Sequence, residues 1–127
     1  MEPGTLVIGA AGLVLAALLA LLVTRRAARG DVPLNSAVGI RTRTTTASQQ
    51  AWVVAHRAAL PWVTGAASAS VASAGLAVVT VLGASAGRQI GQLPAEVVLA
   101  LGYGALVVLL VAATSAGHRA VRRADLL

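Results

Sequence analysis

The sequence predicts an all-α integral membrane protein with three transmembrane helices, a polar cytoplasmic loop and a short amphipathic interfacial helix. Of the 127 residues, 57% are hydrophobic and only 11% are charged, whereas soluble domains carry roughly 25% charged residues. Three apolar runs, at residues 5–24, 61–84 and 94–117, each reach the roughly 20 residues that a helix needs to cross the hydrocarbon core. We therefore treat residues 1–127 as a single membrane domain.

The first span, residues 5–24, contains no ionisable residue. A secretory signal peptide would carry positive charge before its apolar core and a small-residue cleavage site after it. Here Glu2 precedes the run, and Arg25 and Arg26 follow it. This reversed charge order predicts a retained anchor.

The second span, residues 61–84, opens with Pro61, which suits the first turn of a helix because its missing N–H costs nothing there. Its first half, residues 65–75, is almost entirely Gly, Ala and Ser. Small residues at this density let helix backbones approach closely. We therefore expect this helix to be internal to a bundle or an oligomer.

The third span, residues 94–117, follows a short outer loop at residues 85–93 and again opens with a proline. Glu96 at its start suits the positive end of the helix dipole. Gly117 is the expected residue just beyond the helix end, and residues 118–127 form a tail.

The arginines predict the orientation. Nine lie in the loop at residues 25–60 or in the tail: Arg25, Arg26, Arg29, Arg41, Arg43, Arg57, Arg119, Arg122 and Arg123. The outer loop holds only Arg88. Because basic loops stay on the cytoplasmic side, we expect a multi-pass protein of the bacterial cytoplasmic membrane, with its N-terminus outside and its C-terminus in the cytoplasm.

The loop at residues 25–60 is more organised than a topology signal requires. Asn35 and Gly39 carry turn chemistry, and residues 44–60 have a helical pattern. Thr46 and Gln49 match a capping box, while Trp52 and His56 share one helix face. We expect a short amphipathic helix on the inner membrane surface, with Trp52 at the level of the headgroups.

These residues resemble the signature of the SdpI family, small bacterial membrane proteins named for an immunity protein against a secreted toxin. The resemblance rests on Asn35, the run Gly39-Ile40-Arg41-Thr42, Thr45, Ser48, Trp52 and the pair His56–Arg57. Many members carry Pro and Trp where this chain has Arg43 and Thr44, and the founding protein has additional spans. The resemblance implies a minimal, three-span version of that fold and a protective function.

We take the signature residues as a candidate binding site for an anionic lipid or a membrane partner: Asn35, Gly39, Arg41, Thr42, Thr45, Ser48, Trp52, His56 and Arg57. Guanidinium groups and loop N–H groups suit a phosphate or a carboxylate. The alternative for Arg41 is orientation alone. His56 is either a proton-handling group or a hydrogen-bonding link between helix and loop; without a neighbouring acid or thiol, the link is favoured.

The leading functional hypothesis is therefore an SdpI-like protective or envelope-associated protein that binds a lipid headgroup or a membrane partner. One alternative is a small accessory subunit of a larger membrane complex; a weaker one is a lipid-modifying enzyme that uses Arg41 and His56. Catalytic, cofactor and metal motifs are absent from the sequence, which has no cysteine, so we expect no enzyme and no cofactor. The expected partners are membrane lipids and another membrane protein or a second copy of the chain, and not nucleic acid.

Overall fold

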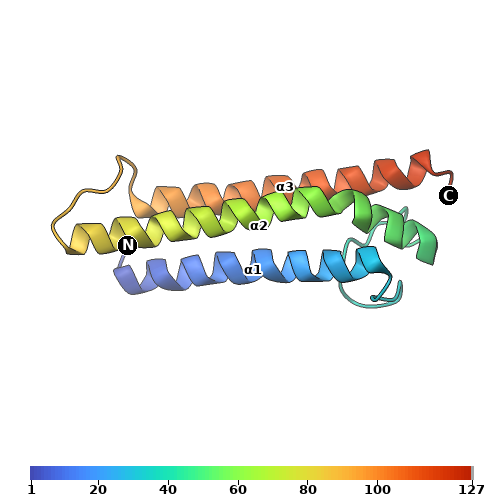
Figure 1. The fold of residues 1–127 in the computed structure, drawn as a ribbon, viewed down its shortest axis with the longest axis horizontal. Coiled ribbons are helices and arrows are strands. Elements are labelled where there is room, and N and C mark those ends of the chain that lie inside the picture. The colour runs from blue at the N-terminus through green and yellow to red at the C-terminus, as the bar shows by residue number, and fades with distance from the viewer. Residues whose placement is uncertain (127) are drawn as a thin grey trace.

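The computed structural model describes residues 1–126 as three helices, α1 (Pro3–Arg29), α2 (Gln49–Ser85) and α3 (Ala95–Arg123). Figure 1 shows them side by side, with the chain direction reversing from each helix to the next. Both α1 and α3 pack on α2, and they contact each other much less. Each helix is long and apolar enough to cross a membrane, so the predicted all-α membrane fold with three spans is confirmed.

The first helix continues past the apolar run into the arginines. Pro3 stands in its first turn, and Gly30 ends it with a left-handed φ of 84°. The Gly30 N–H donates to the Ala27 carbonyl at 3.1 Å, and the Asp31 N–H donates to the Arg26 carbonyl at 3.0 Å. This paired pattern is the Schellman motif, which satisfies carbonyls that a helix end otherwise leaves open.

The second helix begins at Gln49, with Ser48 as its N-cap: the Ser48 hydroxyl accepts a hydrogen bond from the Ala51 N–H at 3.0 Å. The predicted capping box between Thr46 and Gln49 is wrong. Thr46 instead donates to the Thr42 carbonyl at 2.7 Å. The Gln49 side chain accepts from a loop N–H, so both groups stabilise the loop rather than the helix end.

Pro61 lies inside α2 and not in its first turn, which corrects the sequence-based expectation. Residues 49–60 are therefore the first part of one continuous helix. Figure 1 shows α2 changing direction in this first third, as expected where proline removes a helical hydrogen bond and crowds the preceding turn. Membrane helices tolerate such a proline because neighbouring groups satisfy the freed backbone.

The third helix runs six residues past Gly117, to Arg123. Gly117 is therefore not the terminating residue that we predicted. It is buried against α2, where an added Cβ would lie 3.0 Å from the Ala55 carbonyl oxygen. Gly102 has a similar role further along α3, since its Cβ would meet the Ser73 side chain at 2.7 Å. Glycine at these two positions lets α2 and α3 approach closely.

One face of the small-residue segment of α2 is buried within the bundle, at Ala66, Ala67, Ser70, Ala74 and Ala77. This agrees with the prediction of an internal helix. Large apolar side chains on the outer faces are exposed, among them Ile8, Leu15, Leu101, Val107, Val108 and Val111. Such a surface would be a liability in water, and it suits contact with lipid chains.

Candidate binding site at the signature loop

The loop between α1 and α2, residues 31–48, is here called the signature loop. Figure 1 shows that it lies at the end of the bundle where α1 ends, α2 begins and α3 ends. The N–H of Ser36 donates to the Pro33 carbonyl at 3.0 Å, which closes a turn with Asn35 exposed inside it. The predicted turn at Asn35 is thus present.

His56 links α2 to the signature loop through both of its ring nitrogens. Nε2 lies 3.0 Å from the Ile40 backbone nitrogen, which donates to it, and Nδ1 lies 2.8 Å from the Trp52 carbonyl oxygen. Because an acceptor nitrogen carries no proton, the proton of the neutral ring sits on Nδ1. His56 is completely buried, and both of its ring nitrogens already make hydrogen bonds within the protein. The ring is therefore poorly placed as a catalytic base.

Burial also lowers the pKa of His56 below its ordinary value, an effect that outweighs the opposing hydrogen bond to Trp52. The residue lies before Arg57 and Pro61, outside the apolar stretch at residues 61–84. The neutral ring is therefore favoured at pH 7, in agreement with the acceptor function of Nε2.

Gly39 brings the signature loop into contact with α2. Its φ is 103°, in the region that residues with a side chain rarely adopt. A Cβ at this position would lie 2.8 Å from Cη2 of Trp52 and 2.9 Å from Nε2 of His56. Glycine is needed here both for the backbone conformation and for the close approach.

Trp52 is completely buried under the loop. Its ring centroid lies 4.3 Å from that of His56, at an interplanar angle of 45°. Trp52 is therefore not a side chain that anchors the protein by direct contact with lipid headgroups, since the protein itself covers the ring. Trp62 is 42% exposed and remains available for interfacial contact.

Thr45 organises the middle of the loop. Its buried hydroxyl donates to the Ile40 carbonyl at 2.7 Å and accepts from the Thr42 N–H at 2.9 Å. In return, the Thr42 hydroxyl accepts from the Thr45 N–H at 3.1 Å. This reciprocal arrangement fixes the backbone on both sides of Arg41.

Arg41 extends from this fixed backbone and is exposed. Its Nη1 donates to the carbonyls of Ser36 and Leu34, the latter at 3.3 Å. Arg57, at the other end of the signature, donates from Nε to the Ala28 carbonyl at 2.9 Å. That carbonyl belongs to the last turn of α1, where a cation also complements the helix dipole. Arg57 thus holds α2 to α1.

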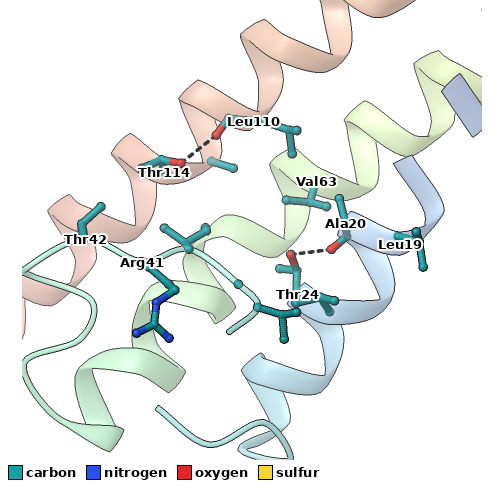
Figure 2. Close-up of a pocket in the computed structure, with 13 residues that line it drawn as sticks. Leu19, Ala20, Thr24, Arg41, Thr42, Val63, Leu110 and Thr114 are labelled. Carbon is teal, nitrogen blue, oxygen red and sulfur yellow. Dashed lines mark hydrogen bonds between the residues drawn. The ribbon is translucent and has the colours of Figure 1, made fainter. Parts of the chain in front are cut away.

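A cavity of about 580 Å³ lies between the signature loop and the three helices, in the gap between α1 and α3 (Figure 2). Most of its wall is apolar. The lining residues are Leu19, Ala20, Val23 and Thr24 of α1, Val38, Gly39, Ile40, Arg41 and Thr42 of the loop, Val63 of α2, and Leu110, Ala113 and Thr114 of α3. Its volume falls within the roughly 300–1,000 Å³ of small-molecule sites.

The structure divides the predicted site residues into two groups. Gly39, Arg41 and Thr42 line the cavity. The others shape the loop or its connection to the helices, as described above for Thr45, Ser48, Trp52, His56 and Arg57, while Asn35 lies in an exposed turn. Sequence reasoning missed the walls from α1 and α3, because nothing in a single apolar run shows which neighbour it will face.

Arg41 is the charged residue in the mostly apolar lining of the cavity. In Figure 2 the guanidinium end of Arg41 points away from Val63 and Leu110, while those side chains belong to the apolar wall. This arrangement suits a ligand with an apolar part and an anionic end. Among residues 1–126, no group of three or more His, Cys, Asp or Glu side chains could hold a metal ion.

Comparison with known proteins gives one match. The model of the SdpI/YfhL protein family matches residues 31–117, which include the signature loop, all of α2 and most of α3. No curated protein and no solved structure matches the chain significantly. The match covers most of the sequence and contains every residue of the signature, so the chain belongs to the SdpI/YfhL protein family.

Proposed function

We propose that the protein is a protective, envelope-associated member of its family that binds an amphiphile with an anionic end in the cavity beneath the signature loop. The observation that carries this proposal is the position of Arg41 at an apolar cavity of about 580 Å³. Such a cavity offers an apolar ligand a site apart from the surrounding lipid, and the guanidinium adds recognition of a phosphate or carboxylate.

Arg41 retains donors for such a ligand. Within residues 1–126 only its Nη1 is engaged, by loop carbonyls, which leaves the Nε and Nη2 protons. The loop backbone on either side is fixed by Thr42 and Thr45, so the guanidinium does not have to be ordered on binding. Preorganisation of this kind raises affinity by lowering the entropic cost.

The proposed orientation puts this site at the cytoplasmic surface of the bacterial plasma membrane. Nine arginines belong to the loop, to α2 just after it, or to the ends of α1 and α3 that lie beside it. By the positive-inside rule this end faces the cytoplasm. Anionic lipids of the inner leaflet would then be concentrated near the cavity.

The experiment is purification in mild detergent from the native host, followed by analysis of bound lipids and co-purifying proteins. Arg41→Gln should lose bound anionic amphiphile by about 10- to 100-fold, because a hydrogen bond to a charged group contributes roughly 1.5–3 kcal/mol. Arg43→Gln is the matched control, since Arg43 is exposed, lies two residues away and does not line the cavity. Equal loss in both variants would contradict the proposal.

Because Arg41 also braces the loop, a second variant leaves the loop intact. Val23→Phe adds bulk to a partly exposed cavity wall on α1 and should displace the ligand while Arg41 remains. The same variants, tested for survival under a membrane-active toxin, examine the protective role. Protection by the wild type and by Arg43→Gln, but not by Arg41→Gln or Val23→Phe, is the expected result.

An accessory-subunit function is the second candidate, and one observation favours it. The outward face of α2 presents small residues, including Gly65, Ser68, Ala72 and Gly75, and is exposed. An added Cβ at Gly65 or Gly75 would meet nothing within 4 Å, so another helix could approach closely there. Co-purification of a second membrane protein at fixed stoichiometry would favour this function over ligand binding.

A further inference from the structure

The polar side chains on the helical walls of the cavity are two threonines, whose hydroxyl protons already make hydrogen bonds within their own helices. Thr24 Oγ1, on α1, donates to the Ala20 carbonyl at 2.8 Å. Thr114 Oγ1, on α3, donates to the Leu110 carbonyl at 3.0 Å. A hydroxyl has one proton and two lone pairs. Toward a ligand, these two threonines therefore act as hydrogen-bond acceptors; Figure 2 shows both internal bonds.

Both threonines lie near the charged C-terminal ends of their helices. Thr24 is the last residue of α1 before Arg25, the first charged residue of that helix, and Thr114 lies in α3 four residues before His118. Leu19 and Leu110 line the cavity further from these charged ends. Along the bundle axis the wall thus changes from hydrocarbon to hydroxyl acceptors, with Arg41 supplied by the loop beside them.

A complementary ligand carries three groups in the same order: a hydrocarbon chain, a hydrogen-bond donor and an anion. A diacyl phospholipid does not fit this order, because both ester groups between its chains and its phosphate are acceptors. A monoacyl glycerophosphate does fit, because its free glycerol hydroxyl is a donor. A hydroxyl donor placed against these oxygens would gain a hydrogen bond, whereas an ester acceptor would gain none, and the added bond raises affinity.

We propose that the cavity selects single-chain amphiphiles with a hydroxyl donor between the chain and the phosphate, the chemistry of a lysophospholipid, over diacyl phospholipids. This inference rests on the function proposed above and specifies its ligand. The cavity volume of about 580 Å³ is that of a site for one drug-sized ligand, which favours one chain over two.

The test compares two probes, 1-palmitoyl lysophosphatidic acid and its 2-O-methyl ether, in which a methyl group replaces the proton of the donor. Binding to the purified full-length protein is measured in detergent by native mass spectrometry or by equilibrium titration. The wild type should prefer the free hydroxyl by about 3- to 10-fold, the range given by one neutral hydrogen bond. Dipalmitoyl phosphatidic acid, with two ester acceptors, should bind more weakly than the lysolipid.

The double variant Thr24→Val, Thr114→Val removes the acceptors and keeps the side-chain shape, so it should bind both single-chain probes equally. Thr80→Val is the control, because Thr80 makes the same bond to its own helix, at 2.9 Å, far from this cavity. The control should keep the wild-type preference. A double variant that also keeps it would overturn the assignment of Thr24 and Thr114.

The outcomes separate this inference from the function on which it rests. If the wild type binds both single-chain probes equally, and Arg41→Gln weakens both, the donor inference is wrong and the anionic amphiphile site stands. If no probe binds the wild type, both proposals are wrong. If the diacyl lipid binds best, the cavity accepts two chains and the lysolipid assignment is wrong.

Discussion

Nε2 of His56 accepts a hydrogen bond from the backbone N–H of Ile40 at 3.0 Å, and this bond joins α2 to the signature loop. It holds the backbone next to Arg41 in the position where the loop lines the cavity. Of the two roles that the sequence left open for His56, the structure shows the favoured one, a hydrogen-bonding link between helix and loop.

Replacing His56 should destabilise the protein. His56→Phe keeps a ring but removes the acceptor nitrogen. The partly buried backbone N–H of Ile40 then has no hydrogen-bond partner, at a cost of about 1–3 kcal/mol. The thermal unfolding midpoint in detergent should fall by several degrees. His118→Phe is the control, since His118 lies near the end of α3, away from this bond. An unchanged midpoint for His56→Phe would show that the link contributes nothing.

Acidification should weaken the same link. The folded protein lowers the pKa of His56, so the unfolded chain, with an ordinary value of about 6.5, binds the proton more readily. The free energy of unfolding contributed by neutral His56 is therefore fully present above about pH 6.5. It decreases as the pH falls through that value toward the lowered pKa of the folded protein. The unfolding midpoint, measured from pH 8 to pH 5, should decline more steeply in the wild type than in His56→Gln.

Gly39→Ala should damage the loop more than a comparable change elsewhere. Alanine at Gly39 meets both an unfavourable φ and the rings of Trp52 and His56. Gly87 also has a positive φ, of 71°, but an added Cβ there meets nothing within 4 Å. Gly87→Ala should therefore cost about 1 kcal/mol, from backbone strain alone, and Gly39→Ala more. Equal unfolding midpoints would mean that the contact with α2 is easily relieved.

The orientation can be tested directly because the chain has no cysteine. Ala37→Cys and Gln92→Cys place one thiol in the exposed part of each loop. A membrane-impermeant maleimide applied to intact cells, or to spheroplasts where an outer layer blocks access, should label Gln92→Cys, and should label Ala37→Cys only after lysis. The reverse pattern would place the signature loop outside the cytoplasm.

The sequence was sufficient for the helices and insufficient for the cavity. Long apolar runs predicted the three helices, because crossing hydrocarbon requires length and hydropathy alone. The start of α2 was predicted wrongly because proline usually stands in the first turn of a helix. In the packed bundle Pro61 instead lies inside α2, where the helix bends. Trp52 was expected at the membrane surface, and only the folded loop shows that Gly39 covers it.

The resemblance at the signature drew attention to the loop at residues 31–48, and in the structure most of the signature residues support one another. Thr45, His56 and Gly39 make contacts that depend on the loop folding back onto α2. No spacing rule predicts that Thr24 and Thr114 line one cavity, because they come from α1 and α3, two helices far apart in the sequence. Their importance follows from tertiary structure alone.

The central claim, that an anionic amphiphile occupies the cavity beneath the signature loop, is tested most directly by photo-crosslinking. A single-chain phosphate amphiphile with a diazirine in its chain is bound to the purified protein, irradiated, and its attachment sites are mapped by mass spectrometry. The account predicts attachment concentrated at residues 19–24 and 110–114, reduced by Val23→Phe. Attachment spread evenly over lipid-facing positions such as Ile8, Leu101 and Val107, and unchanged in that variant, would contradict it.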